Sequence, residues 1–197
     1  MRSALQVLPS AIAQAVRHET DWFLIGGQAV RCFVPYRPSR DVDFGVTSPL
    51  ALKRLEARLR HSGRVEIIER APDTVHLSFE GIDVSLFVLP HLRKHVEHHV
   101  LTLNGLFATK LHALLDRGTR RDFFDLYVLL DAQHMGLCDC IEALRTVYKQ
   151  PINQGLLLRA LCYFDEAEAE ASLPGEGAAD WKAVKAFFTK AVGALVV

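Results

Sequence analysis

The sequence has no excess charge of either sign, few cysteines and no repetitive segment. Lysine plus arginine and aspartate plus glutamate both number 23 in 197 residues, so the formal net charge is zero. This excludes a protein that coats nucleic acid through overall positive charge, but it allows a local basic patch. The four cysteines include no C-x-x-C pair and no disulfide-like spacing, and Cys138-x-Cys140 alone supplies too few ligands for a metal site. We therefore expect reduced cysteines.

The sequence also shows no pattern typical of a targeting segment or of a membrane-spanning segment. The N-terminus lacks the basic and then apolar order of a signal peptide, and no apolar run approaches the length that spans a bilayer. We therefore expect a cytoplasmic protein with no membrane partner. Half of the residues are hydrophobic and no low-complexity stretch occurs, which is typical of a globular fold.

Residues 22–46 are predicted to fold as a strand, a glycine turn, a short helix and a second strand. The run 22–25 is apolar and too short for a helix, so it reads as a buried strand. Gly26 and Gly27 allow a sharp turn and a close approach of the backbone to a ligand. A helix over 28–33 would then direct its free N–H groups and its positive dipole end toward that turn.

Asp41 and Asp43 follow this turn on the second predicted strand. Side chains alternate along a strand, so both carboxylates project to one side, with Cα atoms roughly 6.6 Å apart, while Val42 and Phe44 enter the core. An isolated D-x-D is more often a solvent-facing pair on an edge strand. Its position after a phosphate-binding type of turn instead favours two metal-binding carboxylates beside a nucleotide.

Further strands and helices are indicated downstream. A helix is predicted from Pro49 to about residue 60, and strands over 64–69, 74–79 and 82–88. In the last strand Asp83 and Ser85 lie opposite to an apolar face. Asp83 is either a solvated residue or a third carboxylate beside Asp41 and Asp43.

Four histidines cluster in a segment that bridges to the second half of the chain, and that half is predicted to be mainly helical. His91, His95 and His99 would share one helical face, as a solvated linker or as a metal site. Helices are expected from 106 to Gly118 and from 121 to about 132, followed by two more, an acidic linker over 165–180 and a last helix from 181.

Two charged pairs stand out on the first two of these helices. Lys110 and Arg117 lie together at the edge of one apolar stripe, and Asp122 and Asp125 share a flank of the next helix. Taken alone, Asp125 reads as the partner of Arg121 in a surface pair.

These residues together resemble the motifs of a known family. The first motif reads Gly26-Gly27-Gln-Ala and then Arg37-x-Ser39-x-Asp41-Val-Asp43-Phe. It is similar to the first motif of polymerase-β-like nucleotidyltransferases and, more narrowly, to that of the AbiEii toxins of bacterial abortive-infection and toxin–antitoxin systems. A series of residues in the second half of the chain reads Ala108-x-Lys110-x-x-Ala113-x-x-x-Arg117-x-x-x-Arg121-Asp122-x-x-Asp125-Leu126. It resembles the family's third motif, with Arg121 in place of a common lysine.

The resemblance implies a fold and a reaction. The fold would be α+β, with a small mixed nucleotidyltransferase sheet flanked by helices over 1–100 and a helical half over 101–197, which is either separate or continuous with it. The reaction would transfer NMP from an NTP to an acceptor, which in some relatives is the 3′ end of tRNA. An antitoxin is the implied protein partner.

The resemblance also implies roles for individual residues. The expected metal ligands for Mg²⁺ or Mn²⁺ are Asp41, Asp43 and Asp83. The expected nucleotide-binding residues are Gly26, Gly27, Arg37, Ser39 and Lys110. The expected catalytic set is Asp41, Asp43, Lys110 and Asp122.

The acceptor and the activity have alternatives. A tRNA acceptor predicts a basic surface formed by Arg37, Arg40, Arg117, Arg120 and Arg121. A small-molecule acceptor such as an antibiotic predicts an enclosed acidic pocket. The third possibility is a nucleotide-binding or partner-binding module without catalysis.

Overall fold

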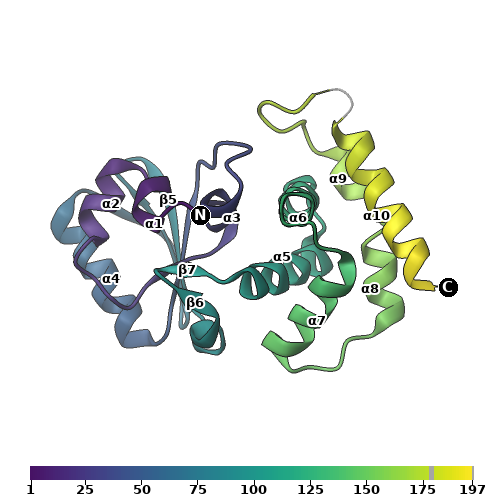
Figure 1. Ribbon diagram of the computed structural model, residues 1–197. Helices are drawn as coiled ribbons and strands as arrows, with labels where there is room; N and C mark the ends of the chain where they lie inside the picture. The colour runs from purple at the N-terminus through teal and green to yellow at the C-terminus, as the bar shows by residue number, and fades with distance from the viewer. Residues whose placement is uncertain (178–179, 197) are drawn as a thin grey trace. The chain divides into compact units, whose positions relative to one another are not determined.

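The computed structural model describes residues 1–177 and 180–196, and the chain divides into two compact units, Met1–Thr102 and Leu103–Val197 (Figure 1). The first unit contains the whole sheet, and the second is helical. The α+β class with a mixed sheet flanked by helices is confirmed. Over the described residues, no helix has the combination of length and apolarity needed to cross a membrane.

The first unit is built on one seven-stranded sheet with the order β3-β4-β5-β2-β1-β7-β6. The strands are β1 Phe23–Leu24, β2 Val42–Val46, β3 Val65–Ala71, β4 Thr74–Phe79, β5 Ile82–Val88, β6 Val96–Glu97 and β7 Val100–Leu101. The sheet is mixed because β2–β5 and β1–β7 are parallel, whereas the other neighbours are antiparallel. The central strand β2 lies between its parallel neighbour β5 and its antiparallel neighbour β1.

The helices of this unit are α1 Ala4–Val7, α2 Ser10–Val16, α3 Gly26–Phe33, α4 Pro49–Ser62 and the 3₁₀ helix η1 Pro90–His95. One face of the sheet is the core face, where Val42, Phe44 and Leu86 are 0 % exposed. α4 covers this face, because its Glu56 accepts a 2.7 Å hydrogen bond from Arg70, the register partner of buried Val75. Figure 1 shows α2 and α4 on the same side of the strands.

The histidine segment does not form one continuous helix. After η1 the chain makes the hairpin β6–β7, whose turn residues His98 and His99 have left-handed φ values of 50° and 64°. His99 stacks on Trp22 with ring centroids 4.3 Å apart, and β7 pairs with β1. The shared helical face of three histidines was therefore a wrong prediction, because pairing with the sheet outweighed the local helical spacing.

The helices of the second unit are α5 Leu103–Arg117, α6 Arg120–Gln133, α7 Leu137–Tyr148, α8 Gln154–Ala160, α9 Asp165–Ala169 and α10 Asp180–Val196. The expected acidic linker 165–180 is partly helical, as α9, and its residues 178–179 lie outside the described part. Trp181 of α10 packs on Phe123, with centroids 5.8 Å apart, and under the guanidinium of Arg120 at 4.4 Å. These contacts fix the last helix against α6.

Candidate functional site

The two carboxylates of the first motif lie at the start of β2. Asp41 precedes the strand and Asp43 lies within it, and both are half-buried. Their neighbours Val42 and Phe44 are 0 % exposed in the core, so alternation directs Asp43 to the opposite face of the sheet. The Asp43 carbonyl accepts a 3.1 Å hydrogen bond from Ile25 N, which joins β2 to the start of the glycine turn.

The glycine turn packs directly against the residues that the sequence places with it. Gly26 has φ +61°, and a Cβ there would overlap Asp43 Oδ2. A Cβ on Gly27 would lie 2.7 Å from Ser39 Oγ and 3.2 Å from Arg37 Nη2. Both glycines are therefore needed for close approach, and Asp43, Ser39 and Arg37 gather around the first turn of α3.

Gln28 holds this arrangement together and was not predicted as a site residue. It is 1 % exposed, and its Nε2 donates to the carbonyl oxygens of Ser39 at 3.2 Å and Asp41 at 3.3 Å. Its Oε1 accepts a 2.8 Å hydrogen bond from Arg31 Nη1. A polar residue at a core-facing helix position is the sequence signal for such a role, because buried polar groups require partners.

Arg37 lies inside the loop that leads to Asp41. It is 8 % exposed; its Nε donates to the Tyr36 hydroxyl at 2.7 Å and its Nη1 to the Pro38 carbonyl at 3.2 Å. Its guanidinium is thereby directed toward the Gly27 side of the turn, where Nη2 approaches the glycine.

The predicted basic surface of five arginines needs a correction. Arg37 and Arg120 are only 8 % and 7 % exposed, so neither contributes to an exposed surface. Arg120 is held by Glu176, which accepts a 2.9 Å bond from its Nε, and by the Ala167 carbonyl at 3.3 Å. Arg120 thus joins α6 to the acidic segment and to α10. The spacing of residues in the sequence did not reveal these contacts.

Asp83 lies on the same face of the sheet as Asp43. The register pairs Val42 with Val84 and Asp43 with Ser85, so continuing it by one residue places Asp83 beside Asp41. Asp83 is exposed. The described residues contain no group of three His, Cys, Asp or Glu side chains placed to hold one metal ion.

The donor set still suits a hard divalent ion. Mg²⁺ prefers oxygen ligands and usually binds through one or two carboxylates together with substrate phosphates. Asp41 and Asp43 supply two such carboxylates beside the turn, which meets that requirement without a third protein ligand.

The remaining predicted residues form a separate group in the second unit. Lys110 Nζ donates to Asp125 Oδ2 at 2.6 Å and lies 3.8 Å from Asp122 Oδ1. Both carboxylates are 0 % exposed, and Lys110 is 4 % exposed. Asp125 is therefore a buried member of an ion pair and not a surface residue. Lys110 comes from α5, 15 residues earlier in the chain, and helical spacing within α6 does not indicate this contact.

Asp122 is the centre of this group. Arg117 donates to it through Nε at 2.8 Å and Nη2 at 3.0 Å, and Thr119 Oγ1 donates to it at 2.6 Å. Burial would raise the pKa of Asp122. The hydrogen bonds from Arg117 and Thr119, with the charges of Lys110 and Arg117, outweigh burial and hold that pKa below its usual range.

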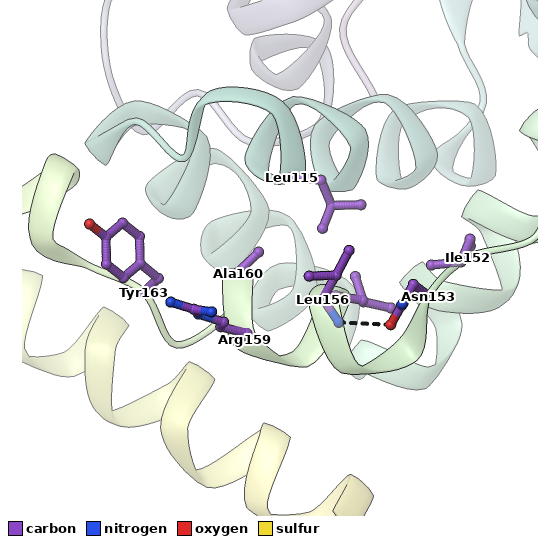
Figure 2. Close-up of a pocket in the computed structure, with 8 residues that line it drawn as sticks. Leu115, Ile152, Asn153, Leu156, Arg159, Ala160 and Tyr163 are labelled. Atoms are coloured by element: carbon purple, nitrogen blue, oxygen red, sulfur yellow. Dashed lines mark hydrogen bonds between the residues drawn. The ribbon is translucent and has the colours of Figure 1, made fainter.

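The second unit also contains an apolar groove of about 500 Å³ (Figure 2). Its lining residues are Leu115, Ile152, Asn153, Leu156, Leu157, Arg159, Ala160 and Tyr163. None of the predicted site residues lines it. Arg159 is the one charged side chain among these lining residues.

Comparison with known proteins agrees with the fold and with the motifs. A family model described as nucleotidyl transferase AbiEii toxin, type IV toxin–antitoxin system, matches residues 10–194. The uncharacterised protein aq_aa25 of Aquifex aeolicus is 25 % identical over 181 residues, covering 87 % of this chain and 86 % of that protein.

Two solved structures from Helicobacter pylori share the fold. JHP933 superposes with a TM-score of 0.57 at 17 % identity, covering 95 % of this chain and 90 % of the other. A second protein, with a proposed nucleotidyltransferase activity, superposes with a TM-score of 0.56 at 18 % identity, covering 98 % and 95 %.

Proposed function

The chain belongs to the family of AbiEii nucleotidyl transferase toxins of type IV toxin–antitoxin systems, and from this premise we propose a specific reaction. Membership makes the protein a nucleotidyltransferase and implies an antitoxin as its partner. We propose that it transfers NMP from an NTP to the 3′ end of an RNA, with tRNA as the acceptor, in the cytoplasm.

The observation that carries the proposal is the packing of the glycine turn against Asp43. Gly26 leaves no room for a Cβ beside the Asp43 carboxylate, and Gly27 leaves little beside Ser39 and Arg37. A carboxylate, a hydroxyl and a guanidinium thus converge on the first turn of an eight-residue helix. Helix N-termini and arginines bind phosphates, and adjacent carboxylates hold the accompanying cation.

Asp41 and Asp43 are the proposed ligands of Mg²⁺ or Mn²⁺, with Asp83 as a candidate third ligand. A bound divalent ion would neutralise triphosphate charge and lower the pKa of the attacking hydroxyl. Gly26, Gly27, Arg37 and Ser39 are the proposed phosphate ligands. They would orient the α-phosphorus so that the acceptor oxygen forms its bond as the bond to pyrophosphate breaks.

Lys110 and Asp122 form the second part of the proposal. An ammonium has three donors, and Lys110 uses one of them on Asp125, so further donors are available for a phosphate oxygen. Asp125 and Asp122 orient the ammonium, which is the role we propose for Asp122. We expect Lys110→Arg to replace it poorly, since a planar fork does not substitute for a compact charge.

A small-molecule acceptor is the second candidate, and the charge of the outer strands favours it. Glu69 of β3 is the register partner of His76, so it shares the face that carries Asp43. This exposed glutamate would attract a cationic acceptor.

Incubation with each labelled NTP, Mg²⁺ and either total tRNA or a panel of aminoglycosides tests the proposal. Label on tRNA that is lost in Asp43→Asn is the expected result. Label on the small molecules alone would replace the RNA acceptor with a drug acceptor. Absence of label with every NTP and acceptor would leave a binding module instead of an enzyme.

A further inference from the structure

A pair of polar residues lies beside Asp43 on the side of β2 away from the glycine turn. Ser85 of β5 is the register partner of Asp43, and His76 of β4 is the register partner of Ser85. His76 Nδ1 and Ser85 Oγ share a hydrogen bond of 2.9 Å. The three residues therefore form one row across three neighbouring strands, on the face opposite to the core.

The pair is held in a defined geometry. The His76 ring packs edge-on against Phe87, with centroids 5.7 Å apart and an interplanar angle of 79°. Val75 and Leu77, on either side of His76, are 0 % and 1 % exposed, so the strand keeps His76 on the outer face.

The Ser85 hydroxyl can bond a second group. A hydroxyl has one donor and two acceptor positions, so Ser85 keeps free capacity whichever of the two residues donates. Within residues 1–177 and 180–196, its side chain makes no hydrogen bond other than that to His76. A polar group fixed by a neighbour and open on its other side is suited to binding a substrate.

The order of the strands indicates which part of the substrates would approach Ser85. The order runs β4-β5-β2-β1, and the glycine turn follows β1, so the proposed phosphate site and the Ser85–His76 pair flank Asp43 on opposite sides. In phosphoryl and nucleotidyl transfer the attacking and leaving oxygens are roughly in line through the phosphorus. If the leaving pyrophosphate binds at the turn, the attacking hydroxyl comes from the β5 side.

We propose that Ser85 Oγ binds the attacking hydroxyl of the RNA acceptor and that His76 is a positioning residue, which fixes the Ser85 hydroxyl. The inference rests on the proposed nucleotidyl transfer. In that step the acceptor oxygen bonds to the α-phosphorus, the bond to pyrophosphate breaks and pyrophosphate keeps the electron pair. The acceptor proton is released to solvent, so the pair orients the hydroxyl without keeping its proton.

The test is initial-rate kinetics of wild type, Ser85→Ala, His76→Ala and the double variant, with NTP and tRNA varied in turn. Each single variant should raise the KM for tRNA about tenfold, the scale of one lost hydrogen bond, and leave the KM for NTP within about twofold. The double variant should be no worse than either single variant, because both act through one hydroxyl. His76→Asn, which keeps a polar atom near Nδ1, should restore most of the loss.

Thr74→Ala is the matched control. Thr74 lies on the same strand and face as His76 and is the register partner of Phe87, but it has no place in the row with Asp43. Its kinetics should be those of wild type. A second measurement compares binding of a short RNA that ends in a 3′-hydroxyl with that of its 3′-deoxy form. Wild type should prefer the hydroxyl form, and Ser85→Ala should bind both equally.

Three outcomes would overturn the inference. An unchanged KM for tRNA in Ser85→Ala and His76→Ala would reject it and leave the proposed function intact. A raised KM for NTP alone would assign the pair to the nucleotide. Failure of wild type to label any acceptor would reject the proposed function, and the inference would fail with it.

Discussion

At the scale of single residues, close approach at Gly26 is the feature on which the site depends. Its φ of +61° lies in the left-handed region, and its missing Cβ leaves the space that Asp43 Oδ2 occupies. Both properties require glycine, and the second would affect the proposed reaction because a Cβ there would displace the Asp43 carboxylate.

We predict that Gly26→Ala lowers transfer at least about a hundredfold, since displaced catalytic groups lose alignment. The left-handed strain alone should cost about 1–2 kcal/mol of stability. Gly175→Ala is the control, because Gly175 has φ +82° and no heavy atom within 4 Å of its added Cβ. Equal activities of the two variants, measured with their thermal melts, would show that Asp43 is not constrained by the turn.

The carboxylates themselves give a second prediction at this scale. Asp41→Asn and Asp43→Asn should each reduce transfer by about a hundredfold or more, because each change removes one negative oxygen ligand from the proposed cation site. Asp73→Asn, at an exposed carboxylate between β3 and β4, is the comparison. If Asp41→Asn transfers nucleotide at the wild-type rate, Asp41 is not a residue of the active site.

At the scale of elements, the buried ion pair between α5 and α6 joins the two helices that carry the third motif. Lys110 and Asp125 come from different helices, and neither is more than 4 % exposed. Breaking one member of a buried pair is costly because the other charge is left without compensation. Variants of Lys110 therefore change stability as well as any phosphate contact.

A double-mutant cycle measures this coupling. Lys110→Met and Asp125→Leu should each lower the free energy of unfolding by about 3–5 kcal/mol. The double variant should lose clearly less than the sum, because each single change already removes the contact that Lys110 and Asp125 share. Urea unfolding of the four proteins gives the coupling energy, and strict additivity would contradict the ion pair. Any loss of NTP use in Lys110→Ala is then assessed well below its melting temperature.

Acid stability of the same elements follows from Asp122. Its folded pKa is depressed, so its contribution to stability is fully present above the unfolded value of about 3.9 and is lost as pH falls through the folded pKa. Wild type should therefore melt above Asp122→Asn at pH 7, and the gap should close below about pH 4. A gap that does not change between pH 7 and pH 3 would contradict this ionisation.

At the scale of the whole molecule, zero net charge means that any RNA binding depends on local cations. Of the five arginines predicted to form a basic surface, Arg40, Arg117 and Arg121 are exposed. Arg117 also bonds Asp122, which reduces its availability to a phosphate. The electrostatic contribution to RNA binding is therefore expected to come from few contacts.

Salt dependence tests this expectation. Arg40→Ala should weaken tRNA binding and reduce the slope of log K against log salt by roughly one unit, as for one lost phosphate contact. Lys53→Ala is the control, since this exposed lysine lies on α4, which covers the core face of the sheet. Equal slopes for the two variants would place the RNA away from the loop that contains Arg40.

The predictions from sequence succeeded where short-range patterns decide structure. β4 and β5 have the predicted bounds, and Asp43 lies within β2 between buried Val42 and Phe44, as alternation required, whereas Asp41 precedes the strand. The family assignment, based on two motifs, is confirmed by the match over residues 10–194. The prediction that His91, His95 and His99 share a helical face failed because their spacing is a local signal, whereas the hairpin there is stabilised by pairing with β1.

By itself, the sequence determined the glycine turn, the strand with its two carboxylates and the order of the helices, because periodicity and turn preference depend on near neighbours in the chain. Only the tertiary structure decided that Arg37 and Arg120 are buried, that Lys110 pairs with Asp125, and that Ser85 and His76 align with Asp43. These facts depend on register and on packing between segments distant in sequence. The charge of a side chain does not reveal its partner until the fold brings the two together.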